Sequence, residues 1–169
     1  MKEPKVELKK ISFYERMSEE TNCFVADLYI NGKKVGEVKN DGQGGCTNYR
    51  GFTKENNEII RQAEEYFNTL PKVKSEYGFT YQPSLENEID DQLEQYLKAK
   101  AEKKMQKLME TAIIIGKPNG SGYSYIKQGR KLSEIPVNIL QPHIDKLKAK
   151  YCKDGVVILN TNLKELGIN

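Results

Sequence analysis

The chain has little of the side-chain chemistry that enzymes and metal sites use. His143 is its only histidine, and its three cysteines, Cys23, Cys46 and Cys152, lie far apart without a CxxC pair. Structural zinc and a disulfide framework both need paired ligands, so this spacing argues against them. His143 directly follows Pro142, and the sequence places no nucleophile beside it. We therefore expect a protein that is not an enzyme and that holds no metal and no cofactor.

Long apolar runs are also missing. No run approaches the ~20 residues that a membrane-spanning helix needs, and the N-terminal MKEPKVELKK lacks the apolar stretch of a signal peptide. Hydrophobic residues make up 37% of the chain and charged residues 30%, a composition typical of a globular protein on the polar side. The sequence therefore predicts a soluble, cytoplasmic protein.

Arginine is scarce. Only four of the 27 basic residues are arginine, and 24 acidic residues reduce the net charge to +3. A domain that reads duplex DNA usually carries a stronger basic excess, with arginines that bind bases or phosphates bidentately. The composition therefore does not indicate a general affinity for nucleic acid.

The clearest pattern is the charged stretch from Ser84 to Ala112, which predicts one long helix. Ser84 can cap the first amides, while acidic residues crowd the start and lysines crowd the end, as the helix dipole favours. Such a helix is about 43 Å long, which is more than one small domain needs. Lys100, Lys103, Lys104 and Lys107 form either a solvated face or an anion-binding face.

The apolar residues of this helix recur at a spacing of four, so their stripe drifts to a different face in the second half. We expect the first half to pack on the N-terminal part of the chain. The second half needs a separate cover, either from the C-terminal strands or from a second copy of the chain, and we favour a homo-oligomer. The two groups are Leu85, Ile89 and Leu93, and then Met105, Leu108 and Met109.

The N-terminal part resembles an antiparallel meander of three strands followed by a helix. Val6 to Tyr14 is the first strand, and a switch in its apolar phase indicates a bulge or burial on both faces. Asn31-Gly32 joins two alternating runs, which is the strongest short-range signal for a hairpin. A helix from Lys54 to Leu70, capped by Thr53, should cover the meander with its apolar face. A further short strand is expected at Phe79–Tyr81.

The C-terminal part is predicted as strand, strand, helix, strand. Ala112–Ile115 and Tyr123–Lys127 form the first two strands, joined by a turn at Lys117–Gly122. Pro142 is expected at the first position of the helix, and Val156–Leu159 is a buried strand.

These elements predict an α+β fold in three parts. Residues 1–82 form a meander-plus-helix unit, residues 83–112 the long connecting helix, and residues 113–169 a β-β-α-β unit. A chain of 169 residues can also bury one shared core, so a single domain is the alternative.

The loop after the meander is the most unusual stretch of the chain. Four glycines in ten residues let the backbone approach a bound group closely, as phosphate-cradling loops do. The nucleotide motifs GxxxxGK[ST] and GxGxxG are absent. The loop is therefore either a wide turn or a ligand-binding loop. Its candidate ligand-binding residues are Asn40, Asp41, Gly44, Gly45, Asn48, Tyr49 and Arg50.

A second candidate site lies in the segment from Lys117 to Lys131. Glycines, basic residues and two tyrosines alternate there, which suits holding a phosphate while stacking a base. The alternative is a hairpin whose tyrosines lie half in the core. The candidate residues are Lys117, Tyr123, Tyr125, Lys127, Arg130 and Lys131.

Four segments carry a resemblance: KISFYERMSEET, VKNDGQGGCTNYRG, ENEIDDQLEQYLKAKAEKKMQKLMETA and GVVILNTNL. Through them nearly the whole chain resembles a group of small accessory proteins of bacteriophages and related mobile elements. The likeness contains no motif tied to an activity, so it implies a setting, the host-cell cytoplasm, and gives no residue a role. Proteins of this kind often bind or block a host component, including defence proteins and their nucleotide signals.

We therefore expect a non-catalytic, phage-type binding protein that recognises the phosphates of a nucleotide or nucleic acid and can counter a host defence system. The alternative is a protein–protein interaction module whose long helix binds or inhibits a host protein.

Overall fold

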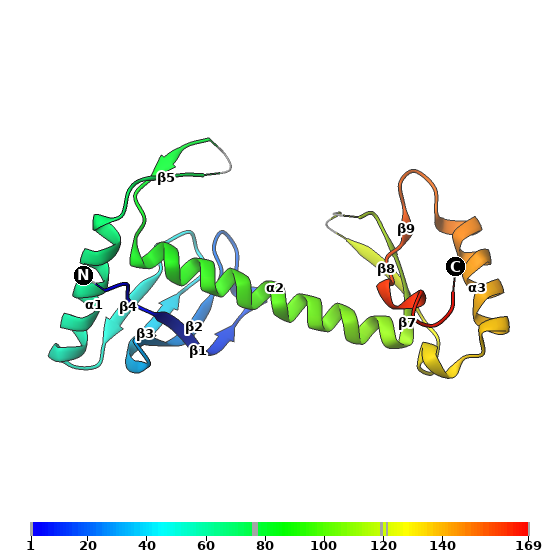
Figure 1. Cartoon of the computed structure of the whole chain (residues 1–169), viewed down its shortest axis with the longest axis horizontal. Coiled ribbons are helices and arrows are strands. Elements are labelled where there is room, and N and C mark those ends of the chain that lie inside the picture. The colour runs from blue at the N-terminus through cyan, green and yellow to red at the C-terminus, as the bar shows by residue number, and fades with distance from the viewer. Residues whose placement is uncertain (1, 76–77, 119, 121, 169) are drawn as a thin grey trace. The chain divides into compact units, whose positions relative to one another are not determined.

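The computed structural model describes residues 2–75, 78–118, 120 and 122–168 (Figure 1). The chain divides into two compact units, residues 1–97 and residues 98–169, and each unit has its own hydrophobic core. The long helix α2 (Leu85–Thr111) begins in the first unit and ends in the second. The α+β fold predicted from the sequence is confirmed.

Four antiparallel strands form the sheet of the N-terminal unit, in the order β1-β2-β3-β4. They are β1 (Val6–Phe13), β2 (Phe24–Ile30), β3 (Lys33–Asn40) and β4 (Asn48–Gly51). Asn31 and Gly32 join β2 to β3 with φ values of 53° and 78°, the left-handed conformations that a two-residue hairpin turn requires. The sequence predicts a meander of three strands, but the sheet has a fourth. The end of the glycine-rich stretch forms β4, which pairs with β3.

The first strand contains the bulge that its sequence indicates. The pairing of β1 with β2 shifts between Lys9 and Ser12, and Lys10 adopts a φ of 51°. The irregularity lets Phe13 pair with Phe24, which is a core residue. The change of apolar phase along this strand is therefore confirmed as a bulge.

Two helices pack against the same face of this sheet. α1 (Lys54–Thr69) is capped by Thr53, whose Oγ1 accepts a hydrogen bond from Asn56 N at 3.2 Å. Ser84 caps α2 in the same way, accepting from Asn87 N at 3.1 Å. Both predicted caps are confirmed, and so is the packing of the first half of α2 on the N-terminal sheet. The core contains Phe24, Leu28, Ile30, Ile60, Phe67, Leu85, Ile89 and Leu93.

A short hairpin of β5 (Val73–Lys74) and β6 (Thr80–Tyr81) follows α1. Its base is held by Gln82, whose Nε2 donates to the carbonyl of Leu70 at 2.9 Å and to two further carbonyls of the α1 terminus at 3.3 and 3.4 Å. Carbonyls at a helix end lack partners within the helix, so this side chain caps α1. β6 confirms the short strand expected there.

The C-terminal unit contains a three-stranded antiparallel sheet in the order β8-β7-β9, with α3 packed against it. Its elements are β7 (Ala112–Gly116), β8 (Tyr123–Lys127), α3 (Val137–Tyr151) and β9 (Val157–Ile158). The predicted β-β-α-β order is confirmed, but the prediction of a buried last strand is wrong, because β9 has two residues and Val157 is 39% exposed. Asn119 and Ser121 of the predicted turn lie outside the described residues. Single 3-10 turns lie at Glu15–Met17, Leu132–Glu134 and Thr161–Leu163.

Helix α3 begins earlier than the sequence predicts. The expectation that Pro142 takes the first helical position is wrong, because the helix starts at Val137 and contains Pro142 in its interior. The carbonyl of Pro136 accepts a hydrogen bond from Leu140 N at 3.0 Å. Burial of Leu140 and Ile144, which are 1% and 0% exposed, offsets the backbone hydrogen bond that Pro142 is unable to donate.

Asn160 extends the short strand β9. Its Oδ1 accepts a hydrogen bond from Ile114 N at 2.7 Å, and its Nδ2 donates to Ala112 O at 2.9 Å. The backbone contacts of this segment with β7 end with Ile158 opposite Ile115 and a hydrogen bond from Leu159 N to Ile114 O at 2.9 Å. The buried side chain of Asn160 therefore supplies the next pair of hydrogen bonds along β7.

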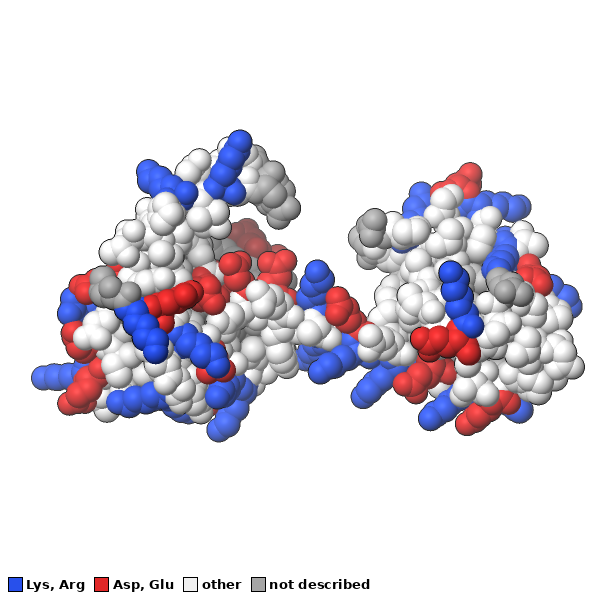
Figure 2. Space-filling view, in the orientation of Figure 1, with Lys and Arg blue, Asp and Glu red and all other residues white. Residues whose placement is uncertain are grey.

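The second half of α2 has little cover until its end. Residues 98–104 are all exposed, and Figure 2 shows acidic side chains along the first half of the helix and basic ones around its middle. Met109 is buried, and Thr161 Oγ1 lies 3.6 Å from its Sδ. The same chain therefore covers Met109.

In the part of the chain that the structure describes, no helix is long and apolar enough to cross a membrane.

Candidate functional site

The glycine-rich loop between β3 and β4 packs on the turn that precedes β2. The carbonyl of Gly42 accepts hydrogen bonds from the amides of Glu19 and Glu20, both at 3.0 Å, and of Thr21 at 3.3 Å. Gly42 has a φ of +85°, and a Cβ atom there would lie 2.1 Å from the carbonyl oxygen of Met17. Glycine is therefore required at this position by the contact between two loops.

Asn40 holds this loop in place with its side-chain amide. Its Oδ1 accepts from Gly42 N and from Thr21 Oγ1, both at 2.9 Å. Its Nδ2 donates to Gly45 O at 3.0 Å and to Thr47 Oγ1 at 3.3 Å. Asn40 is only 7% exposed, so its polar atoms are used within the protein.

Four backbone amides of this loop, those of Gly42, Gln43, Gly44 and Thr47, already donate to side chains. Thr47 N donates to Glu86 Oε1, and Thr47 Oγ1 donates to Asp90 Oδ1, both at 2.7 Å. Packing of the loop against Asp90 raises the pKa of its carboxyl; the hydrogen bond from Thr47 opposes this shift, and the charges of Glu86 and Asp91 add to it. Gly44 N likewise donates to Thr21 Oγ1. The carboxylates of Glu86 and Asp90, which lie within hydrogen-bond distance of Thr47, would repel an anion bound at this loop. This favours the interpretation of the loop as a wide turn.

Two neighbouring candidates of the first site lie on opposite faces of β4. Tyr49 is half-buried, and its hydroxyl donates to Glu64 Oε1 on α1 at 2.8 Å. Burial and this bond to Glu64 raise the pKa of Tyr49 well above its usual value. Arg50 is exposed and lies opposite Glu37 of β3 on the uncovered face of the sheet. The structure therefore places Tyr49 and Arg50 on opposite faces of the sheet, while Asn40 and Gly45 are hydrogen-bonded to each other within the loop.

The uncovered face of the N-terminal sheet is largely neutralised by its own charges. Asp27 lies 2.8 Å from Lys34 Nζ and 3.8 Å from Lys10 Nζ. The hydrogen bond from Lys34 is the main cause that lowers the pKa of Asp27. Lys9 Nζ lies 4.3 Å from the ring centroid of Tyr29. The charged side chains at the centre of this face are therefore engaged with neighbours on the same sheet.

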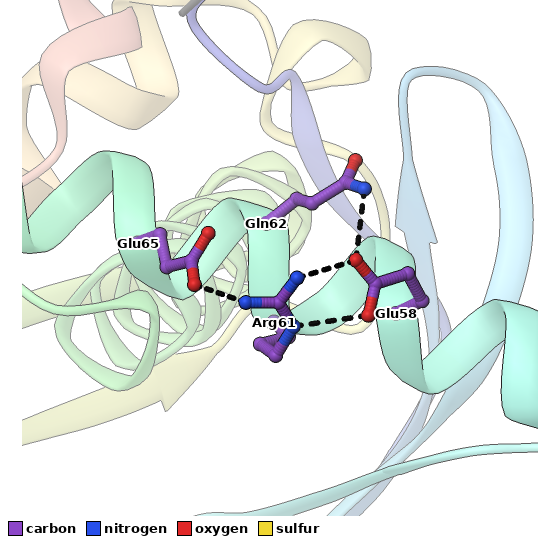
Figure 3. A network of polar contacts seen from close by, with 4 residues as sticks. All are labelled: Glu58, Arg61, Gln62 and Glu65. Carbon is purple, nitrogen blue, oxygen red and sulfur yellow. Dashed lines mark hydrogen bonds and ion pairs between the residues drawn. The ribbon is translucent and has the colours of Figure 1, made fainter.

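Arg61 shows the same internal pairing on α1 (Figure 3). Its Nε donates to Glu58 Oε2 at 2.9 Å, its Nη2 donates to Glu58 Oε1 at 2.5 Å, and its Nη1 donates to Glu65. The hydrogen bonds from Arg61, and then the one from Gln62, lower the pKa of Glu58 to about 2. Two carboxylates therefore occupy this guanidinium, which leaves it poorly placed to bind an external anion.

The second candidate site is different, because three of its six residues share one face of a strand. Tyr123, Tyr125 and Lys127 alternate along β8, and they pair with Gly116, Ile114 and Ala112 of β7. The two tyrosines are 42% and 49% exposed. β8 is an edge strand, pairing with β7 alone among the described strands. The expectation of tyrosines on one face of the strand thus agrees with its register.

Charge along this segment has a single sign. Residues 117–133 contain four basic residues, Lys117, Lys127, Arg130 and Lys131, and no acidic residue. All four are exposed, and in residues 2–75, 78–118, 120 and 122–168 none of them has an ion-pair partner. Lys127 Nζ lies 6.0 Å from the ring centroid of Tyr125. We call this set of six residues the β8 surface.

Sequence reasoning missed residues beside β4. Lys39 and Phe52 lie on the uncovered face with Asn48 and Arg50, where they line a pocket. Phe52 has no local signal of strand alternation, because it lies in the bend that follows the end of β4 at Gly51. Over the described residues, no group of three or more histidine, cysteine, aspartate or glutamate side chains is arranged to hold a metal ion.

Comparison with protein-family models, with curated proteins and with solved structures found no match to the chain.

Proposed function

We propose that the C-terminal unit binds single-stranded nucleic acid through the β8 surface. The observation that carries this proposal is the pair of half-exposed tyrosines on one face of an edge strand, flanked by four basic residues without a carboxylate among them. Successive bases stack on aromatic rings, and lysines follow the phosphates, as in other binders of single strands.

The chemistry of this surface favours single strands with little sequence preference. Tyr123 and Tyr125 lie two positions apart on a strand, and therefore about 7 Å apart along it. Stacking needs bases that are free of pairing partners, which a duplex does not offer. Arg130 is the only arginine of the surface, so bidentate reading of base edges is limited. The resemblance to accessory proteins of bacteriophages supports an intracellular nucleic acid as the target.

The rival function, a protein–protein module on the long helix, has less support from the geometry. The apolar residues of α2 are used at both ends, with Leu85, Ile89 and Leu93 in the N-terminal core and Met109 buried in the C-terminal unit. The exposed middle of the helix, residues 98–104, carries lysines, alanines and one glutamate. A docking helix would need an apolar face instead.

The test is fluorescence anisotropy with a labelled 20-nucleotide single strand, and with the matching duplex. Removing one stacking tyrosine should weaken single-strand binding by about 5-fold or more, since stacking contributes about 1–3 kcal/mol per base. Lys127→Glu should weaken binding and reduce its salt dependence. Duplex binding should be weaker than single-strand binding.

Tyr151→Ala is the matched control. Tyr151 is 40% exposed and has Lys150 Nζ 4.8 Å from its ring centroid, but it lies at the end of α3. The Tyr151→Ala variant should bind the single strand with the same affinity as the unaltered protein. Equal losses in Tyr151→Ala and Tyr125→Ala would show that the effect is not specific to β8. Absence of strand binding, with a host protein recovered in a pull-down, would favour the rival function.

A further inference from the structure

The N-terminal unit has a pocket at the β4 edge of its uncovered sheet face. The pocket has a volume of about 610 Å³ and is lined by Glu37, Lys39, Asn48, Tyr49, Arg50, Gly51 and Phe52. Small-molecule sites usually have volumes of about 300–1,000 Å³. The pocket shares no residue with the β8 surface, which belongs to the other unit.

The register of β3 and β4 places four of these side chains on one face. Lys39 pairs with Asn48, and Glu37 pairs with Arg50. Phe52 lies in the bend just after β4, where its amide donates to Val35 O at 3.1 Å, and it also lines the pocket. Two cations, one amide, one carboxylate and one aromatic ring therefore line the same pocket.

The two cations of the pocket differ from the others on this sheet. Lys34 and Lys10 are held by Asp27, whereas within the described part of the chain neither Lys39 nor Arg50 has an ion-pair partner. Both are exposed. Glu37 lies opposite Arg50 in the register but forms no ion pair with it. The ammonium and the guanidinium therefore suit a phosphate group, which the guanidinium can bind bidentately.

Phe52 supplies the apolar part of the pocket. It is 55% exposed, and Lys34 Nζ lies 5.1 Å from its ring centroid. Asn48 Nδ2 donates to Cys46 O at 3.0 Å, so its Oδ1 remains as an acceptor. Glu37 is a second acceptor. A planar ring on Phe52, with hydroxyl or amino groups bonded to Asn48 and Glu37, would use all of these groups.

We propose that this pocket binds a nucleoside phosphate, with its base on Phe52 and its phosphate on Lys39 and Arg50. The same chemistry is present in a free nucleotide and at the phosphorylated end of a nucleic acid strand. The recognised group is therefore the terminal nucleoside phosphate in either source.

The test is isothermal titration calorimetry of the full chain with ATP, GTP, CTP and UTP. Pyrophosphate, which has only the phosphate part of the ligand, and adenosine, which has only the nucleoside part, serve as comparison ligands. Saturable binding of at least one nucleotide is expected, tighter than either pyrophosphate or adenosine. Arg50→Ala, Lys39→Ala and Phe52→Ala should each weaken it about 5-fold or more, since each removes a charge-assisted or stacking contact. These side chains are exposed, so the melting temperature should stay nearly constant.

Matched controls exist for both kinds of contact. Phe79 is 59% exposed on the β5–β6 hairpin, and Lys9 lies over Tyr29 on the same sheet. Phe79→Ala and Lys9→Ala should retain nucleotide affinity. The inference is overturned if no nucleotide binds more tightly than pyrophosphate, or if the controls lose as much affinity as the pocket variants.

Two further measurements separate the sources and the sites. Competition by a 5′-phosphorylated oligonucleotide, but not by the unphosphorylated one, would assign the ligand to a strand end; competition by neither would assign it to a free nucleotide. Tyr123→Ala with Tyr125→Ala should leave nucleotide binding intact even where strand binding is lost. If this double variant abolishes nucleotide binding, the nucleotide binds at the β8 surface and the inference fails.

Discussion

Gly42 and Gly45, both in the loop between β3 and β4, differ in the room they leave for a side chain. A Cβ atom at Gly42 would overlap the carbonyl oxygen of Met17, and the residue has a φ of +85°. A Cβ atom at Gly45 would meet nothing within 4 Å. Only the first position therefore requires glycine for the fold.

We expect Gly42→Ala to lower the free energy of unfolding by about 2 kcal/mol or more, because a left-handed φ and a backbone clash act together. Gly45→Ala should change it by less than about 0.5 kcal/mol. Urea denaturation of both variants measures the difference. Equal stabilities would mean that the loop shifts freely and that its contact with the turn before β2 contributes little.

Among the elements, the C-terminal sheet depends on one side chain. Asn160→Ala would leave the buried amide of Ile114 and the carbonyl of Ala112 without their partner. We expect a loss of about 2–4 kcal/mol, since each unpaired buried group costs about 1–3 kcal/mol. Thermal and urea unfolding measure the loss.

Asn162→Ala serves as the comparison, because its Nδ2 donates to one carbonyl, that of Met109, at 3.1 Å, and its Oδ1 accepts only a long 3.4 Å hydrogen bond from Asn160. It should cost about 1 kcal/mol or less. If Asn160→Ala lowers the free energy of unfolding by no more than Asn162→Ala does, water replaces the hydrogen bonds of Asn160. The pairing of β9 with β7 would then not depend on this side chain.

Elements with local signals could be predicted from the sequence. The caps at Thr53 and Ser84 and the turn at Asn31-Gly32 depend on side chains within a few residues of each other. β4 was missed because it is a strand only through its pairing with β3. The start of α3 was missed because burial of Leu140 outweighs the local preference of proline.

The candidate sites were predictable to unequal degrees. In β8 the tyrosines and Lys127 alternate within one strand, so their common face follows from the sequence. In the glycine-rich loop, nothing local shows that Asn40 bonds inward or that Tyr49 reaches Glu64 on α1. Those contacts depend on tertiary packing, which spacing alone does not contain.

The whole molecule has two hydrophobic cores, one in each unit. Ile144 is fully buried in the second and Leu28 in the first. We expect Ile144→Ala to destabilise the C-terminal unit by about 2–5 kcal/mol, the usual cost of such a cavity. Hydrogen exchange should then rise along β7 while protection of β2 and β3 is retained.

Leu28→Ala should give the reverse pattern, with protection lost in the N-terminal sheet and kept in β7. Loss of protection in both units from either variant would mean that the two cores unfold as one cooperative system.

An isolated helix frays from its ends, because its terminal residues have the fewest hydrogen bonds and neighbours. In α2 both ends are anchored, by Leu85 and Ile89 at the start and by Met109 near the close, while residues 98–104 between them are exposed. The order of fraying is therefore inverted. The helix is weakest at its centre, where transient opening breaks few packing contacts and a protease would find its first cleavage site.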